Sequence, residues 1–455
     1  MENIETVKTN KYLLKITIPI FIELLLNCLI GNVDQFMISN QSQTAFSAIG
    51  NANQIINMLI IVFNVINLAT IIMISQYRGA ENYDKIQQIY SLSLVVNITF
   101  GVLVSAIIIF FKEPLLNWLQ CPESLMHDSM IYLTYVGGSL FLTSLYLTFA
   151  SFFKSNGMMK HSMYFSILMN VINIVSNFFL LYGFFGLPKL GIWGVCISTV
   201  LSKIIGLIII IISARKNLNA RISFRNLFPF PRKLFTKMME IGLPSAGENF
   251  AYSISIIVIQ KAINSFGSLV VAARVTVNLI SFISWIFAFA IAQTTQIVVG
   301  FLMGAGDIEG TARRFRVSRN ISVLLSFFGS LLLFIFSETI CGLFVKDPEI
   351  IKICRQILFI DIFVEIGRAL NLCTVRALQA CGDTKFPIVL GIIDEWVVAV
   401  GGAFLLGVVF NLGIVGVWIA LASDELIRGI IFTIRWNRGK WRNMSIVEKN
   451  DTLTA

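Results

Sequence analysis

The sequence predicts an all-α polytopic membrane protein of about twelve transmembrane helices, arranged in two six-helix bundles. Its 455 residues are 56% hydrophobic and only 13% charged, with a mean hydropathy of +0.80. Soluble domains carry about 25% charged residues, so this chain has too few charges to cover a surface that faces water. Apolar stretches of about 20 residues, the length that crosses the hydrocarbon core of a bilayer, recur along the whole chain.

The expected helices follow one another in close succession. Long apolar runs favour helices over barrel strands, because strands would alternate polar and apolar residues at every second position. The first run is too long for a signal peptide, and it follows a polar N-terminus. The expected spans are residues 12–38, 48–74, 86–111, 128–153, 161–184, 190–214, 237–265, 272–302, 315–337, 352–379, 386–410 and 412–435.

The basic residues lie mainly in every second connection. The connection between the sixth and seventh spans carries seven of them, from Arg215 to Lys237, and the C-terminal tail carries four, from Arg435 to Arg442. Lysines and arginines collect in cytoplasmic loops, so this asymmetry predicts a multi-pass protein of the cell (plasma) membrane with both termini in the cytoplasm. Topology thereby accounts for the net charge of +10 without a nucleic-acid partner.

The two halves of the chain repeat each other at an offset of 225 residues, so that Pro19 and Glu23 match Pro244 and Glu248. Near the end of each half, "LGIWGVCIS" matches "LGIVGVWIA" at an offset of 222. Each half holds six expected helices, so both halves enter the membrane from the same side. Such parallel repeats are related by a pseudo-two-fold axis along the membrane normal and are typical of transporters. The predicted domains are residues 1–214, a cytoplasmic linker at 215–236, residues 237–435 and a cytoplasmic tail at 436–455.

Polar residues within the expected spans of the first half form one candidate site. Asp34 lies among apolar neighbours, where a carboxylate needs a cation, a hydrogen-bond donor or a proton. Asn170, Asn173 and Asn177 share one face of the fifth expected helix, and such amides coordinate a cation or hydrogen-bond a carboxylate. The alternatives are that Asp34 is wetted near the extracellular end and that the amides only join neighbouring helices.

The second half carries more charge within its expected spans. Asp361, Glu365, Arg368 and Asn371 share one face of the tenth helix, and the spacing of Glu365 and Arg368 predicts an ion pair. The alternative is that these two charges only neutralise each other, in which case the pair is structural and does not contact substrate. Glu248 has no opposite charge one helical turn away, so we expect it to be an unpaired acid that faces a cavity.

Two adjacent acids, Asp394 and Glu395, lie in the eleventh expected span. Neighbouring residues of an α-helix point in different directions. At most one of these two carboxylates is therefore expected to line a central cavity.

Together, these residues resemble the multidrug and toxic compound extrusion (MATE) family of the MOP flippase superfamily, in its bacterial type, over essentially the whole chain. The resemblance rests on "GNVDQFMIS", "FSAIGNANQI", "SQYRGAENYDK", "NVINIVSNFFLLYG", "LGIWGVCIS", "GLPSAGENF" and "RALQACGDTKFP", which occur in this order. The family has two six-helix bundles arranged as a V, and its members export small molecules in exchange for cations. The resemblance therefore implies this fold and this activity for the chain.

The resemblance also assigns roles to single residues of the first half. Asp34 matches the acid of the first helix on which coupling to H⁺ or Na⁺ is centred. Asn173 matches the amide of that site, and Thr199 matches its hydroxyl group. Asn177 stands where many members carry an aspartate, which removes one negative charge and leaves the choice between H⁺ and Na⁺ open.

In the second half the chain departs from the family's pattern. Glu248 lies about one turn before the glutamate that one branch uses as a cation ligand, and Arg368 occupies the position of its aspartate partner. The resemblance therefore argues against a second Na⁺ site there. Glu248, Glu365, Arg368 and Asn371 are instead expected to line a cavity in the C-terminal half.

The predicted function is secondary active multidrug efflux: cationic or amphipathic small molecules, antibiotics among them, leave in exchange for H⁺ or Na⁺ by alternating access. One alternative is a flippase for lipid-linked oligosaccharides, which would need a strongly cationic cavity, whereas the intramembrane charge here leans acidic. Another is a membrane enzyme, but His127 and His161 lie at predicted helix ends, and no Walker, kinase or metalloprotease motif is present. We therefore expect no enzymatic activity, no cofactor, no metal other than Na⁺ at Asp34, and a monomer in the lipid bilayer.

Overall fold

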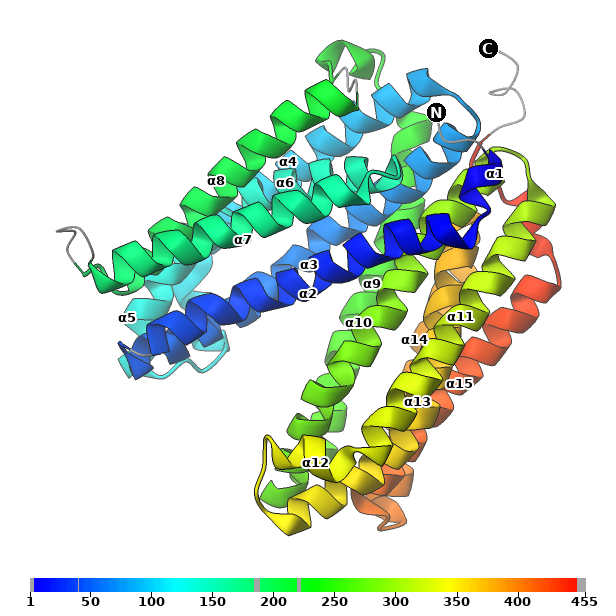
Figure 1. Cartoon of the computed structure of the whole chain (residues 1–455). Helices are drawn as coiled ribbons and strands as arrows, with labels where there is room; N and C mark the ends of the chain where they lie inside the picture. Colours follow the sequence, from blue (N-terminus) through cyan, green and yellow to red (C-terminus); the bar gives the residue numbers. More distant parts are fainter. Residues whose placement is uncertain (1–3, 40, 184–188, 219–221, 448–455) are drawn as a thin grey trace. The chain divides into compact units, whose positions relative to one another are not determined.

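The computed structural model describes residues 4–39, 41–183, 189–218 and 222–447 (Figure 1). Residues 219–221 of the expected linker and 448–455 of the expected tail lie outside these ranges. The described chain divides into two compact units. Unit 1 comprises Met1–Phe21, Ser75–Glu81 and Leu243–Ala455, and unit 2 comprises Ile22–Ile74 and Asn82–Gly242. The predicted division into lobes at residues 1–214 and 237–435 stays a prediction.

The first repeat is built from helices throughout its described residues. Its connections are short, and α5, the π-helix η1 and α6 form one series with a bend of 42°. Its elements are α1 (Ile4–Val7), α2 (Asn10–Ser39), α3 (Gln43–Gly79), α4 (Tyr83–Trp118), α5 (Glu123–Tyr132), η1 (Leu133–Gly137), α6 (Leu140–Ser155), α7 (Met159–Tyr182) and α8 (Ile192–Asn217), followed in the linker by η3 (Phe224–Leu227).

The second repeat has the same order of long helices. Within unit 1, α10, α11, α13 and α15 lie side by side (Figure 1). The elements are α9 (Arg232–Asn264), α10 (Ser268–Gly304), α11 (Ile308–Ile335), α12 (Ser337–Gly342), α13 (Pro348–Ala380), α14 (Lys385–Asp394), the π-helices η4 (Glu395–Val400) and η5 (Ala403–Val409), α15 (Gly413–Asn437) and η6 (Lys440–Asn443).

Helical segments coincide with all twelve expected spans, within the part of the chain that the structure describes. Seven of these helices are long and apolar enough to cross a membrane, and eight if the bent series of α5 and α6 is one span. The long helices α9, α13 and α15 are not among the seven, and each of them carries several charged residues. Large apolar side chains such as Phe110, Ile257 and Val397 are exposed, as is required of surfaces that face lipid. The prediction of an all-α polytopic membrane protein is confirmed.

The internal repeat extends to backbone geometry in the turn after the second long helix of each half. Glu81 and Gly306 both adopt the left-handed conformation there, with φ of +58° and +75°. The next residues, Asn82 and Asp307, are 225 positions apart and cap α4 and α11. Their side-chain oxygens accept hydrogen bonds from the backbone N–H three residues later, at 3.1 and 2.8 Å. Each cap satisfies a donor that the first turn of a helix leaves unpaired.

Within unit 1, the end of α3 crosses the end of α10 at two equivalent glycines. A Cβ atom on Gly79 would lie 1.9 Å from the carbonyl oxygen of Phe301. A Cβ atom on Gly304 would lie 1.8 Å from the carbonyl oxygen of Gln76. Gly79 and Gln76 precede Gly304 and Phe301 by 225 residues, so each contact is the symmetry-related copy of the other. This reciprocity is what a parallel repeat predicts, and small residues of this kind let two helix backbones approach closely.

We expect Gly79→Ala and Gly304→Ala each to destabilise the protein, because the added methyl group would meet a backbone oxygen that cannot move alone. Overpacking of this kind costs about 1–3 kcal/mol. The measurement is the thermal unfolding of the purified protein in detergent. Gly342→Ala is the matched control, because nothing lies within 4 Å of the added atom and alanine favours a helix by up to about 1 kcal/mol. Equal unfolding temperatures for all three variants would contradict the close crossing.

Candidate functional site

Asp34, on α2, lies within unit 2 with its side chain buried and hydrogen-bonded on both oxygens. Asn177 of α7 donates from Nδ2 to Asp34 Oδ1 at 2.5 Å. Thr199 of α8 donates from Oγ1 to Asp34 Oδ2 at 2.9 Å. The three side chains are at most 5% exposed. Three helices that are distant in sequence therefore meet at one carboxyl group.

The amide row of α7 continues this site toward Asn173. Asn177 Nδ2 lies 3.3 Å from Asn173 Oδ1, and Asn173 Nδ2 lies 3.4 Å from Thr199 Oγ1. The structure thus brings together Asp34, Asn173, Asn177 and Thr199. Asn170 shares the helix face but does not join them, because it donates to the backbone oxygen of Ser166 at 2.8 Å on its own helix.

Further groups act on Asp34 from two helices. Lys203 stands one turn beyond Thr199 on α8, half-buried, and its positive charge acts on the Asp34 carboxyl group. Tyr132, at the end of α5, is buried and also interacts electrostatically with Asp34. The sequence shows Lys203 as a charge within a span, but only the fold reveals that it faces Asp34.

This arrangement suits a group that changes between a charged and a neutral form. Asn177 and Thr199 supply donors that hold the ionised carboxylate. Asn177 Oδ1 is buried without a hydrogen-bond donor among the described residues, so this oxygen is available to accept a further hydrogen bond. Burial of a carboxyl group favours its association with a proton or a cation.

The first repeat also contains an ion pair that sequence reasoning missed. Lys154 Nζ lies 2.8 Å from Glu23 Oε1, and both side chains are largely buried. Lys154 was expected in the connection after the fourth span, whereas the helix α6 extends to Ser155 and carries it. Glu23 is therefore neutralised within unit 2.

In the second repeat, Glu365 and Arg368 of α13 form the ion pair that their spacing predicts. Glu365 is fully buried and also accepts a hydrogen bond from Ser284 of α10 at 2.8 Å. Arg368 Nε reaches Glu425 of α15 at 3.2 Å. Asn371 donates to the same carboxylate at 2.8 Å. Glu425 therefore joins the predicted residues of α13 to α15.

Glu248 lies on α9, half-buried, away from that pair. A Cβ atom on Gly391 of α14 would lie 3.2 Å from Glu248 Oε1, so this carboxyl group packs against α14. Arg376 and Arg428 are the cations that act on it. Among the ion pairs of the described residues, none involves Glu248. The structure does not bring it into contact with Glu365 or Arg368.

The expectation that Asp394 and Glu395 cannot face the same way is wrong. Asp394 Oδ2 lies 4.0 Å from Arg428 Nε, and Glu395 Oε2 lies 3.3 Å from Arg428 Nη2. Asp394 ends α14 and Glu395 begins the π-helix η4, and both residues keep α-helical backbone angles. The guanidinium group of Arg428 has several N–H groups, so one arginine can reach the carboxyl groups of two successive residues. Arg428, which sequence reasoning did not single out, is the centre of this cluster.

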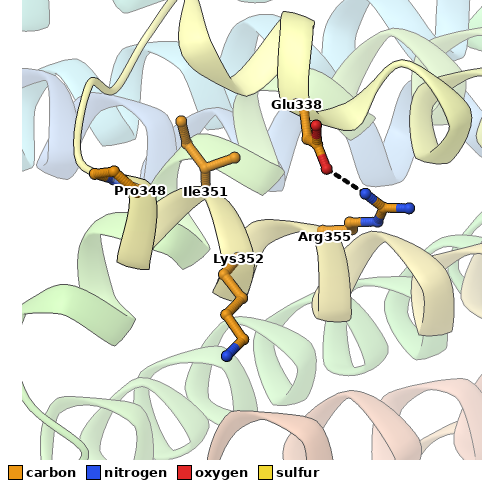
Figure 2. Close-up of a pocket in the computed structure, with 5 residues that line it drawn as sticks. All are labelled: Glu338, Pro348, Ile351, Lys352 and Arg355. Carbon is orange, nitrogen blue, oxygen red and sulfur yellow. Dashed lines mark hydrogen bonds and ion pairs between the residues drawn. The ribbon is translucent and has the colours of Figure 1, made fainter.

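One pocket lies at the start of α13, and none of the residues above lines it. Its lining is drawn in Figure 2 and consists of Glu338, Pro348, Ile351, Lys352 and Arg355. Glu338 and Arg355 form an ion pair whose side chains are 68% and 54% exposed. Because this pair is solvated, the pocket lacks the buried charges that mark the other sites.

The fold and its buried charges define a polytopic transporter with an internal repeat, and the comparisons identify its family. The MatE family model matches the chain twice, at residues 19–179 and 244–405. The two matches begin 225 residues apart, at the offset of the internal repeat. The chain belongs to the MATE family of efflux transporters.

Relatives of known name support this assignment. The chain is 33% identical over 396 residues to an uncharacterized transporter, YisQ, of Bacillus subtilis, with 87% of each chain covered. It is 24% identical over 449 residues to a probable multidrug resistance protein, NorM, of Thermotoga maritima, covering 98% of this chain and 96% of the relative. The chain is therefore a multidrug efflux transporter by family.

A solved structure matches the fold across nearly its whole length. The Vibrio cholerae MATE transporter VcmN in its bent form has a TM-score of 0.88 at 18% identity, covering 96% of this chain and 97% of that one. At this identity the likeness supports the fold alone. The coupling ion and the substrates do not follow from it.

Proposed function

We propose that the protein is a secondary active antiporter that exports cationic or amphipathic small molecules in exchange for H⁺ or Na⁺. Asp34 binds the coupling ion in a pocket with Asn173, Asn177 and Thr199. The observation that carries the proposal is the buried Asp34 carboxyl group, held by donors from α7 and α8 at 2.5 and 2.9 Å. It acts in the plasma membrane as a monomer, with both termini in the cytoplasm.

Antiport requires that the ion favour one of two states of the transporter. By linkage, an ion shifts a conformational equilibrium only if it binds one state more tightly than the other. Protonation of Asp34 would replace an accepted hydrogen bond with a donated one, and Na⁺ would draw the amide oxygens of α7 toward the carboxylate. Either change alters how α2 packs against α7 and α8, and this repacking couples the ion to opening.

The acidic character of the second repeat supports cationic substrates. Asp361, Glu365, Asp394, Glu395 and Asp424 are all buried within unit 1. A ligand that bears pyrophosphate would be repelled by these groups, so the residues favour efflux of cations over the flipping of lipid-linked oligosaccharides.

The test is efflux of a cationic dye from vesicles that contain the purified protein, with a pH gradient and a Na⁺ gradient applied separately. We expect one gradient to drive the dye against its concentration and the other to have little effect. Relatives named as probable multidrug resistance proteins make drugs the substrates to try first, and the buried acids of the second repeat make cationic ones the first choice. Dye movement that follows neither gradient would refute antiport.

A further inference from the structure

A pocket lies in unit 2 beside the linker that joins the two repeats, and none of the buried charges described above lines it. Its volume is about 270 Å³. Because α6 packs against both α4 and α8 (Figure 1), three neighbouring helices border the pocket. The lining residues are Leu94 of α4, Leu145 and Phe149 of α6, Ile211, Ala214 and Arg215 of α8, and Ile222 of the linker.

The lining of this pocket combines an apolar surface with one cation. Six of its seven residues are apolar, and the seventh is Arg215, which is exposed in the last turn of α8. Among the ion pairs of the described residues, none involves Arg215. A guanidinium group binds phosphate and carboxylate groups well. The pocket therefore complements a ligand that has an apolar chain and an anionic group.

The linker is fixed to α4 next to the pocket. The backbone N–H of Ser223 donates to Ser91 Oγ at 3.3 Å, and Ser91 lies about one turn before Leu94 on the same helix. The short helix η3, which follows at once, packs against α4 and carries the exposed Arg225. The linker thus closes one side of the pocket with Ile222 and adds positive charge to this end of the unit.

The position of Arg215 on α8 indicates where the anionic group comes from. Ile208 and Ile212 are 52% and 62% exposed, and the spacings of four and three residues put both on one helix face with Arg215. Exposed isoleucines on a membrane helix face acyl chains. Arg215 therefore stands at the end of a lipid-facing surface, at the depth where a lipid chain ends and its headgroup begins.

The size of the pocket excludes the drugs that the family exports as its complete occupants. Pockets for drug-sized ligands have volumes of about 300–1,000 Å³, whereas this one has about 270 Å³. One flexible acyl chain needs less room than such a drug, and the rest of a lipid can lie along the membrane surface of the helices. Size and charge together favour a phospholipid of the surrounding bilayer.

We propose that this pocket binds one anionic phospholipid, with an acyl chain between α4, α6 and α8 and the phosphate on Arg215. The bound chain contacts Ile222, so the lipid holds the linker against α4. The linker joins the two repeats, and its docking then depends on the anionic lipid content of the membrane. The site is separate from Asp34, and it does not depend on which ion drives transport.

The test is native mass spectrometry of the purified, delipidated full-length protein after addition of phosphatidylglycerol and phosphatidylcholine in equal amounts with the same acyl chains. We expect wild type to retain the anionic lipid about fivefold more, the preference that one cation near an anionic lipid surface provides. Arg215→Gln should abolish this preference. Lys216→Gln is the matched control, because Lys216 is the next residue and does not line the pocket. Equal retention of both lipids by wild type, or equal losses in the two variants, would overturn the proposal.

A second pair of variants tests the apolar part of the pocket. Ile211→Phe places a larger side chain in the lining, so the acyl chain that holds the phosphate at Arg215 loses its room. Its preference for phosphatidylglycerol should fall as far as that of Arg215→Gln. Ile212→Phe makes the same change at the next residue, which is exposed and outside the lining, and should behave like wild type. A wild-type preference in Ile211→Phe would contradict a chain in this pocket. Arg215→Gln, a change at the surface, gives the result even if Ile211→Phe folds poorly.

Two competitors separate a phospholipid from other anions. Inorganic phosphate has the anionic group without a chain, and oleate has a chain with a carboxylate. We expect neither, added in an amount equal to the lipid, to displace phosphatidylglycerol from wild type. Displacement by inorganic phosphate would identify a simple anion site, and displacement by oleate would identify a fatty-acid site. Either result would overturn the assignment to a phospholipid.

Discussion

Asp34→Asn is expected to abolish gradient-driven efflux while leaving a folded protein that still binds its substrate. Asparagine has nearly the size of aspartate. Its oxygen can accept from Asn177, and its amide group can donate to Thr199 Oγ1, whose own proton can go to the backbone oxygen of Val195. It cannot bind a proton or hold a charge. A residue that cannot bind the ion cannot couple it, so we expect driven efflux to fall to the level seen without a gradient. The measurement is dye efflux under the gradient that drives wild type, with substrate binding measured in parallel.

Asp84→Asn is the matched control, because Asp84 is an exposed acid in the first turn of α4. It should transport like wild type. Efflux at the wild-type level from well-folded Asp34→Asn would remove Asp34 from the mechanism. Glu248, which no ion pair within the described chain neutralises, would then be the next acid to test.

Arg428→Met is expected to have the largest effect on stability. Its guanidinium group contacts Asp424, Glu395, Glu425 and Asp394, and its side chain is only 10% exposed. Removing one partner from a buried ion pair costs about 3–5 kcal/mol. Methionine replaces much of the volume, so the loss reflects charge rather than a cavity. The yield of protein in the membrane and its unfolding temperature in detergent measure the effect.

The exposed pair of Figure 2 provides the control for that experiment. Arg355 pairs with Glu338 at the surface, and its side chain is 54% exposed. Exposed pairs contribute about 0–1 kcal/mol, so Arg355→Met should cost little. Lower pH should partly restore Arg428→Met, because protons can neutralise the carboxylates that the arginine leaves behind. Equal effects of the two substitutions would contradict the role of Arg428 as the centre of the cluster.

Much of the first site could be predicted because its residues are unusual for their surroundings. Asp34 is conspicuous in an apolar span, and a spacing of four residues puts Asn173 and Asn177 on one helix face. Periodicity could not show which asparagine on this face of α7 would not bond to the Asp34 site. Asn170, three residues before Asn173, lies on the same face, yet it bonds to its own helix, because the choice depends on where α2 meets α7. The contribution of Lys203 depends in the same way on where α2 meets α8.

The second cluster was harder to predict because it depends on how α15 packs against its neighbours. An α-helical reading of Asp394 and Glu395 separates the two side chains, whereas Arg428 reaches both of them. Arg428 lies one turn after Asp424, which predicts a local pair. Its contacts with α14 and η4 arise only when α15 packs against them.

The most direct test of the central claim is whether a substrate gradient alone drives the coupling ion in the opposite direction. Linkage is reciprocal, so an ion that moves substrate must itself be moved by substrate. Vesicles containing the protein would receive a substrate gradient with no ion gradient, and H⁺ and Na⁺ movement would be followed with ion-sensitive dyes. The account predicts a counterflow of one ion in wild type and none in Asp34→Asn. Substrate movement without ion movement in wild type, or equal ion movement in the variant, would contradict it.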